Sequence, residues 1–270
     1  MRNRLLILVV FCSCALVPTR AQTDTLGLNA TQLFDKGMNA LLGSGVSRND
    51  VTALDSFHRS ADLGYAPAQV VLGYLYETGR IVSAEPMQAL DWYKKAAAQD
   101  DPLAEWLVGH LIYSGAVPPR DLNEASLWFQ KAAAHNDPFG QYFLGRVKLE
   151  RRDYAGAATW LQRAALQGLP QAQEQLGLLL LQGRGVPEDK FGAYVWLLLS
   201  SETSHRPLNN DLQALEADLG SNQVEQAKSK ARELEASTTR AVIAHRCTGW
   251  NGELQAIPAP PPPEIQRFCH

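Results

Sequence analysis

The 270-residue sequence is poor in cysteine, and two of its four cysteines, Cys12 and Cys14, lie in the first 21 residues. This scarcity excludes a small domain held together by several disulfides. Long apolar runs are also absent after the first 21 residues, because no later segment reaches the roughly 20 apolar residues that a membrane-spanning helix needs. We therefore expect no transmembrane segment in the rest of the chain.

Motifs of common enzyme chemistry are missing as well. The sequence has no His-Glu-x-x-His, no Gly-x-Ser-x-Gly and no Walker glycine loop, and the segment from Gly43 to Arg48 lacks the third glycine of a dinucleotide fingerprint. We expect His135 and Asp137 to be a solvated pair at a turn rather than metal ligands. We predict no enzyme activity, no cofactor and no metal site. An enzyme built from scattered residues stays as an alternative.

The first 21 residues have the layout of a secretory signal peptide. Arg2 and Arg4 precede the apolar run from Leu5 to Phe11, and small residues end the segment at Ala21. This arrangement predicts cleavage after Ala21 and a periplasmic or secreted protein. A retained N-terminal helix is one alternative, and a lipoprotein modified at Cys12 or Cys14 is another.

The charge balance argues against nucleic acid as a partner. The formal net charge is −3 and becomes −6 once the three arginines of the leader are removed. Proteins that bind nucleic acid use basic surfaces to neutralise phosphates, and a mildly acidic chain does not fit that requirement.

A repeat of 32 to 36 residues fills the middle of the chain. Glycines preceded by Leu or Val recur at this period, and pairs of small residues follow each at a fixed phase. The glycines are Gly73, Gly109, Gly145 and Gly177, with a drifted first copy at Gly37. Five helix-turn-helix repeats between Ala30 and Ser201 therefore predict an all-α solenoid.

The repeat also predicts how its helices meet. A glycine inside a helix costs about 1 kcal/mol relative to alanine, so the recurring glycines should allow close approach of the two helices of a pair. Between repeats, Gly64, Asp100, Asn136 and Gly168 share one position that suits a left-handed helix cap. Ala66, Pro102, Pro138 and Pro170 follow two residues later, where the next helix should begin.

These patterns resemble the Sel1-like repeat (SLR) family, which is related to tetratricopeptide repeats. The best single match comprises Leu176-Gly177, the turn from Gly183 to Val186, Ala193 and Trp196, and the resemblance covers about Ala30 to Ser201. The copy that contains Gly145 departs from the pattern because it lacks the glycine-rich turn. The resemblance implies a right-handed superhelix, a role as an adaptor for other proteins, and no shared catalytic residues.

One face of the first helices is the candidate binding site. Its residues would line the concave groove that holds peptides in tetratricopeptide-like arrays, and aromatic and arginine side chains are favoured at binding hot spots. The predicted partner-binding residues are Tyr74, Glu77, Trp106, His110, Tyr113, Tyr142 and Arg146. The alternative is that these rings pack between neighbouring repeats. A second aromatic series is interpreted as structural packing, at Trp92, Trp128, Trp160 and Trp196.

The chain after the array divides into two parts. Residues 202–246 predict capping helices, which cover the last apolar face, and residues 247–270 form a proline-rich tail. Cys247 and Cys269 would form a disulfide in an oxidising compartment and contribute on the order of 3 kcal/mol. Two free thiols are the alternative.

The predicted domains are therefore a signal peptide (1–21), the repeat array (22–201), the capping helices and the tail. The predicted function is a non-enzymatic adaptor of the cell envelope or secreted space, which binds another protein or peptide on its concave face. A binder of glycan or peptidoglycan is the alternative, followed by a hydrolase.

Overall fold

The computed structural model describes residues 27–204 and 210–238 as an array of antiparallel helix pairs. Within this part of the chain there are eleven helices and no β-strand, as the repeat pattern predicts. The helices are α1 (Ala30–Leu42), α2 (Asp50–Asp62), α3 (Ala66–Thr78), α4 (Pro86–Ala97), α5 (Pro102–Ser114), α6 (Leu122–Ala134), α7 (Pro138–Glu150), α8 (Tyr154–Leu166), α9 (Pro170–Gln182), α10 (Lys190–Ser204) and α11 (Asn210–Ser237).

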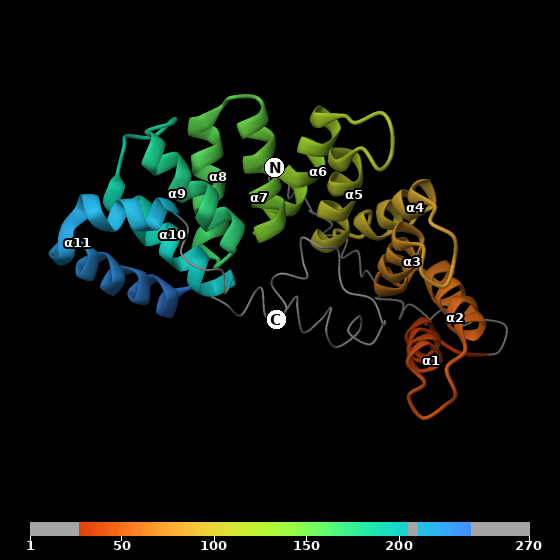
Figure 1. Ribbon diagram of the computed structural model, residues 1–270. Helices are drawn as coiled ribbons and strands as arrows, with labels where there is room; N and C mark the ends of the chain where they lie inside the picture. The colour runs from red at the N-terminus through yellow and green to blue at the C-terminus, as the bar shows by residue number, and fades with distance from the viewer. Residues whose placement is uncertain (1–26, 205–209, 239–270) are drawn as a thin grey trace, which may run out of the picture.

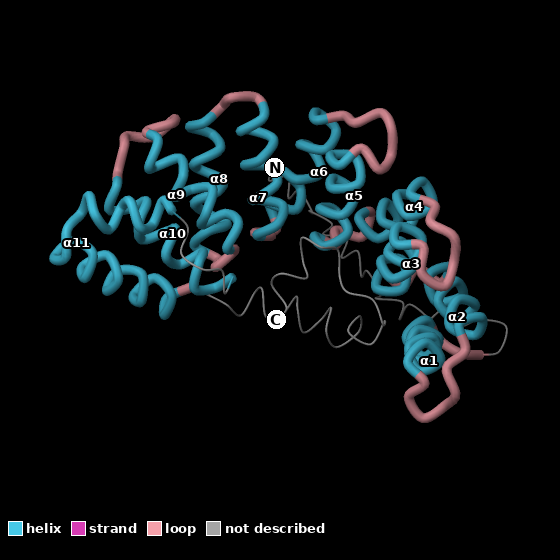
Figure 2. Tube along the Cα trace, viewed as in Figure 1, coloured by secondary structure: helices cyan, strands magenta, loops and turns pink. Residues whose placement is uncertain are grey.

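Successive pairs stack side by side into an arch (Figure 1). Each helix packs against the next one along the chain, and α5 also contacts α7 directly. Helices α1, α3, α5 and α7 lie on the inner side of the arch, and α2, α4, α6 and α8 lie outside them (Figure 2). The fold is therefore the predicted α-solenoid.

The turns between pairs adopt the predicted caps. Asp100 and Asn136 have φ angles of 58° and 59°, and the glycines at the same position are also left-handed. The next helix then begins at Pro102 or Pro138, whose missing N–H costs nothing in the first turn. These caps reverse the chain between one outer helix and the next inner helix.

The recurring glycines allow the helices of each pair to approach closely, as predicted. A Cβ atom on Gly109 would lie 2.6 Å from Cε1 of Phe129, and one on Gly73 would lie 2.4 Å from Cε1 of Tyr93. Both distances are shorter than any real side chain allows. The close approach therefore offsets the cost of a glycine inside a helix.

Helix α11 covers the end of the array. It contains a kink at Gly220, whose φ of 73° and ψ of 163° are not helical, so it consists of two segments as the sequence predicts. Leu212 and Leu215 before the kink and Ala227 after it are buried. The last repeat helix, α10, ends at Ser204 rather than at the predicted Ser201.

Several sequence predictions lie outside the described residues. These are the signal peptide, the Cys247–Cys269 disulfide and the proline-rich tail. In the described part of the chain, no helix combines the length and apolarity needed to cross a membrane.

Candidate binding face on the inner helices

The structure brings four of the seven predicted site residues together around Phe143 of α7. The Phe143 ring centroid lies 5.9 Å from Trp106, 5.3 Å from His110, 5.7 Å from Tyr113 and 5.2 Å from Tyr142. Most of these contacts join α5 to α7. The rings thus form one aromatic cluster across two repeats.

Arg146 of α7 completes this cluster. Its guanidinium carbon lies 5.6 Å from the ring centroid of Tyr113 and 5.9 Å from that of Tyr142. Arginine over the face of a tyrosine ring gains a cation–π attraction. Arg146 is partly exposed, so it presents a positive charge beside the aromatic cluster.

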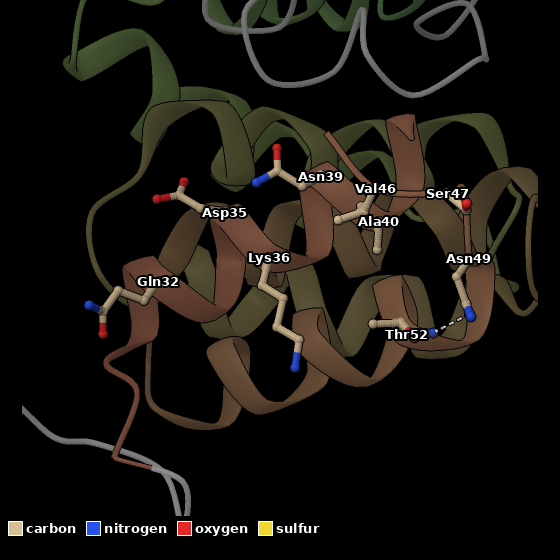
Figure 3. Close-up of a pocket in the computed structure, with 9 residues that line it drawn as sticks. All are labelled: Gln32, Asp35, Lys36, Asn39, Ala40, Val46, Ser47, Asn49 and Thr52. Carbon is tan, nitrogen blue, oxygen red and sulfur yellow. Dashed lines mark hydrogen bonds between the residues drawn. The ribbon is translucent and has the colours of Figure 1, made fainter. Parts of the chain in front are cut away.

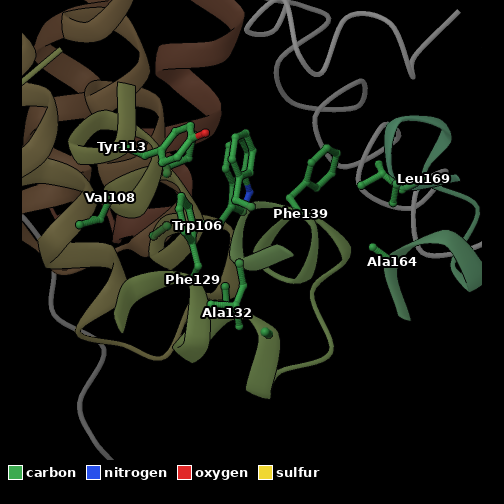
Figure 4. Close-up of a cluster of buried hydrophobic side chains, with 14 of the residues drawn as sticks. Trp106, Val108, Tyr113, Phe129, Ala132, Phe139, Ala164 and Leu169 are labelled. Atoms are coloured by element: carbon green, nitrogen blue, oxygen red, sulfur yellow. The ribbon is translucent and has the colours of Figure 1, made fainter. Parts of the chain in front are cut away.

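Trp106 has no surface for a partner. It is 0% exposed and stacks on Phe139 with a centroid distance of 5.2 Å and an interplanar angle of 23°. Figure 4 shows its indole between Tyr113 and Phe139. For Trp106 the geometry matches the alternative of inter-repeat packing, because an inner helix is covered both by its own partner and by the next pair.

Tyr74 and Glu77 lie on α3, apart from this cluster. Tyr74 is 1% exposed, and burial raises its pKa to about 12. Glu77 is partly exposed and accepts a hydrogen bond of 2.7 Å from the Tyr93 hydroxyl through Oε2. Burial, together with this carboxylate, raises the pKa of Tyr93 well above its ordinary value. Glu77 therefore links α3 to α4, and Tyr74 is part of the buried core.

Exposure of the inner face changes along the array. The residues aligned with Trp106 in α1 and α3 are Phe34 and Val70, and both are buried. The aligned residues in α7 and α9 are Tyr142 and Glu174, and both are partly exposed.

The next position on the same face behaves in the same way. Met38, Tyr74 and His110 are buried, whereas Arg146 and Leu178 are partly exposed. The accessible part of the predicted face is thus on α7 and α9.

A polar link closes one edge of the aromatic cluster. The Tyr113 hydroxyl donates to Glu150, and Arg120 donates to both carboxylate oxygens of Glu150 at 2.9 and 2.7 Å. Burial and the hydrogen bond to Glu150 raise the pKa of Tyr113 to about 12. Partial burial alone would raise the pKa of Glu150, but the hydrogen bonds from Tyr113 and Arg120 outweigh it, so this pKa lies below its ordinary value.

The second aromatic series lies on the outer helices. Trp92, Trp128 and Trp160 are partly buried against the core, and each has a cation three residues later over its ring. The Nζ of Lys95 is 3.6 Å from the Trp92 centroid, and the Nζ of Lys131 is 4.1 Å from that of Trp128. This arrangement is consistent with the structural role that the sequence predicts.

An open cavity of about 490 Å³ lies at the other end of the molecule (Figure 3). It is formed by α1, the turn after it and the start of α2, and most of its side chains are polar. The lining residues are Gln32, Asp35, Lys36, Asn39, Ala40, Val46, Ser47, Asn49 and Thr52. None of the seven predicted site residues lines it.

Phe143, the centre of the cluster, is not among the residues predicted from the sequence. Phe143 is 2% exposed and stacks on Phe129 of the preceding outer helix at 5.2 Å. The aligned residues in the two preceding inner helices are Val71 and Leu107. A change from an aliphatic to an aromatic residue at this position was the available signal.

The helix pairs and their glycine contacts define an α-solenoid protein. The Sel1 repeat model matches residues 37–65, 66–101, 102–137, 138–169 and 170–203, so the chain belongs to the Sel1 repeat family. Proteins built from Sel1 repeats generally act as non-catalytic scaffolds for protein–protein interaction.

Solved structures with the same fold include a Sel1 repeat protein from Oxalobacter formigenes. It is 25% identical, with a TM-score of 0.61, and the match covers 78% of this chain and 91% of that one. A second is c5321, described as a protective antigen of uropathogenic Escherichia coli, which is 23% identical with a TM-score of 0.61. That match covers 80% of this chain but only 55% of the antigen. No curated protein matches the sequence.

Proposed function

We propose that the protein is a non-enzymatic adaptor of the cell envelope or secreted space, and that it binds a partner protein on the partly exposed face of α7 and α9, the first helices of the last two repeats. The observation that carries the proposal is the change in exposure along the inner face. Tyr142 and Arg146 are partly exposed at positions that are buried in the preceding repeats. The predicted signal peptide supports the location, and membership of the Sel1 repeat family supports the adaptor role.

The chemistry of these residues favours a peptide segment as the ligand. The Tyr142 ring offers apolar area with a polar end, and Arg146 offers a cation that can pair with a carboxylate. Leu178 on α9 adds an apolar contact, and Glu174 can accept hydrogen bonds from a peptide backbone. Such a mixture of aromatic and arginine side chains is typical of binding hot spots.

The test uses Tyr142→Ala and Arg146→Ala as separate variants. Each purified protein is immobilised and exposed to a cell-envelope extract from its native source, and captured proteins are identified by mass spectrometry. We expect a specific protein to be captured by the wild type and lost from both variants. Trp106→Ala is unsuitable because emptying a fully buried indole site costs about 3–5 kcal/mol.

Arg163→Ala is the matched control. Arg163 lies on the outer helix α8, with its guanidinium 4.6 Å from the Trp160 centroid, so the change removes the same kind of contact from the other layer. Capture should survive this change, and circular dichroism should be the same for all variants. Equal capture by the wild type, Tyr142→Ala and Arg146→Ala would refute the proposed face.

A glycan-binding role is the second outcome of this test. Sugar rings also stack on tyrosine, so the proteins are mixed with purified peptidoglycan and sedimented. Sedimentation of the wild type but not of Tyr142→Ala, without any captured protein, would replace the adaptor proposal by a glycan-binding one.

A further inference from the structure

Three side chains with metal-ligating atoms converge where α4, α5 and α6 meet. Asp100 lies in the turn after α4, Glu105 in the first turns of α5, and His135 caps the end of α6. Each offers one ligand atom, and these atoms lie within 4.8 Å of one another. The Nε2 atom of His135 is 3.8 Å from Oε2 of Glu105.

The central carboxylate is buried without a hydrogen bond to one of its oxygens. The Glu105 side chain is 3% exposed, and its Oε2 atom has no hydrogen-bond partner among the described residues. A buried charge that is not fully paired costs free energy. Burial raises the pKa of Glu105, with Asp100 and Asp101 adding to the shift and His135 and Lys131 opposing it.

The next junction of the array holds neutral side chains at the same three positions. Asn136, Gln141 and Gln167 occupy there the positions of Asp100, Glu105 and His135. Gln141 Nε2 donates to Asn136 Oδ1 at 2.9 Å, and Gln167 Nε2 donates to Gln141 Oε1 at 2.8 Å. Neutral amides therefore donate to one another in that junction, although Gln167 Oε1 has no hydrogen-bond partner among the described residues.

The preceding junction follows the same rule. Gln99 Nε2 donates to Gln69 Oε1 at 2.9 Å, and Gln69 Nε2 donates to the carbonyl of Ala61 at 3.1 Å. The junction between these two is the one in which all three positions carry ionisable side chains. Glu105 and His135 cannot reproduce the amide chain, because an ionised carboxylate has no proton to donate.

We propose that Asp100, Glu105 and His135 bind a divalent transition-metal ion of the Zn²⁺ type. One imidazole nitrogen and two carboxylate oxygens form a donor set that suits Zn²⁺ rather than Mg²⁺ or Ca²⁺, which prefer oxygen ligands throughout. Water would fill the fourth position. The two negative charges of the carboxylates balance the charge of the ion.

The geometry needs only side-chain adjustment. Zinc bonds of about 2.0–2.2 Å place tetrahedral ligand atoms roughly 3.5 Å apart. The ligand atoms lie within 4.8 Å of one another, so no pair must close by more than about 1.3 Å. Asp100 and His135 are exposed and can rotate towards Glu105, which is held by the surrounding helices.

Other charges around the cluster are compatible with a cation. Asp101 carries a further negative charge, although its side chain also caps α5 by accepting from the backbone of Leu103 and Ala104. Lys131 is an opposing cation, and its ammonium lies over the Trp128 ring. Helices α4 and α6 both end here, and helix C-termini favour positive charge.

The test is a titration of the metal-free, untagged protein with Zn²⁺ alone, in which isothermal titration calorimetry measures the binding. The matched control is the triple variant Asp100→Asn, Glu105→Gln, His135→Gln, which recreates the amide set of the next junction. We expect the wild type to bind one more Zn²⁺ equivalent than the triple variant. Changing a residue that only hydrogen-bonds to a metal ligand alters metal affinity about 10–100-fold, so losing the ligands themselves should weaken this site by roughly 100-fold or more.

Two results would overturn the proposal. The first is that the wild type binds no Zn²⁺ at a Zn²⁺ concentration of about 100 µM. The second is that the wild type and the triple variant bind Zn²⁺ equally, because the ions would then be bound at other residues. His135→Gln alone serves if the triple variant fails to fold. Its side chain is 42% exposed, so the fold should survive while the affinity for the extra equivalent falls.

Discussion

Two consecutive repeats of this solenoid use one backbone plan with different side chains. The repeat formed by α5 and α6 places Gly109 against the flat ring of Phe129, whereas the repeat formed by α7 and α8 places Gly145 against the branched side chain of Leu161. A ring that is stacked on Phe143 has little freedom to move, and a leucine can change rotamer. The first repeat is therefore the more tightly constrained of the two.

The junctions in front of these repeats differ in a second way. The junction before α7 holds a chain of neutral amide hydrogen bonds through Gln141, and the junction before α5 holds a buried carboxylate, Glu105. One oxygen in each junction, on Gln167 and on Glu105, has no donor among the described residues. Equal backbone geometry thus supports either a neutral amide network or an ionisable cluster. Only the second type carries the charged side chains that the proposed metal site needs.

The largest effect should come from the glycine contact. Gly109→Leu places a branched side chain where a single Cβ would already lie 2.6 Å from Phe129. Because overpacking of this kind forces the helices apart, we expect a loss of about 3 kcal/mol or more in the free energy of unfolding. Urea denaturation followed by circular dichroism measures the change.

Gly145→Leu gives the comparison for this change. Its nearest contact is Cγ of Leu161 at 2.9 Å, so the neighbouring side chain can yield more easily. We expect a smaller loss than at Gly109. Equal losses would mean that the ring of Phe129 adds no rigidity, and an unchanged stability for Gly109→Leu would remove the close-approach explanation altogether.

The next largest effect should come from placing a carboxylate in the junction before α7, at the position that Glu105 occupies in the junction before α5. Gln141→Glu removes the donor to Asn136 Oδ1 and brings two acceptors face to face in a buried site. We expect a loss of about 2 kcal/mol at pH 8, because a buried polar group without a partner costs about 1–3 kcal/mol. The measurement is urea unfolding in the presence of a chelator.

Gln162→Glu makes the same change at an exposed position of α8. It should alter the free energy of unfolding by no more than about 0.5 kcal/mol. A similar loss at both positions would show that added negative charge, and not the broken hydrogen bond, is responsible.

The converse change should have the opposite sign. Glu105→Gln provides a side-chain N–H donor at a position that is Gln69 and Gln173 in two other repeats. There the glutamines donate to the carbonyls of Ala61 and Ala165. With a chelator present, we expect the variant to be more stable than the wild type by about 1 kcal/mol. Loss of stability instead would mean that the ionised Glu105 already has adequate partners.

The sequence predicts the architecture well, because it depends on features that recur. The glycines at one phase, the left-handed residues Asp100 and Asn136, and the prolines that begin inner helices each reflect a local backbone requirement, and the structure confirms them. A repeat makes each local signal visible several times over. Helix pairs, turns and their order follow directly.

The sequence predicts which helix face carries the candidate binding residues, but it does not predict how exposed each of them is. Spacing puts Trp106 and Tyr142 at equivalent positions on their helices, yet Trp106 is buried and Tyr142 is partly exposed. The difference arises from neighbours such as Phe139 and Phe143, which belong to the next inner helix and fill the space around Trp106. Contacts between repeats depend on side-chain volume across a junction, which helical periodicity does not report.

The ionisable junction could have been found from the sequence. Aligned repeats show Asp100, Glu105 and His135 where the next copy has Asn136, Gln141 and Gln167, a coordinated change at three positions. The residues lie up to 35 positions apart, so no short motif contains them. Only their meeting at one junction gives the change a chemical meaning.

The smallest effect should come from the link that joins the two repeats at the surface. Arg120 lies in the long turn of one repeat and Glu150 at the end of α7 in the next, with 2.7 Å between Nη2 and Oε2. Arg120→Ala should lower the melting temperature by about 2 °C or less at pH 7, since exposed ion pairs contribute little. Arg151→Ala, which removes a hydrogen bond to Asn123 in the same region, is the matched control.

The sign of the pH dependence identifies this link. The pKa of Glu150 is lower in the folded protein than its ordinary value of 4.5, so its contribution is fully present above about pH 4.5 and disappears as the pH falls through the lower, folded value. The difference in melting temperature between the wild type and Arg120→Ala should therefore narrow below pH 4.5. The Arg151→Ala difference should stay constant over the same range, because Asn123 does not titrate. A gap for Arg120→Ala that persists at pH 3 would assign its effect to the hydrogen bond of 2.6 Å from Arg120 Nε to the Tyr113 carbonyl instead.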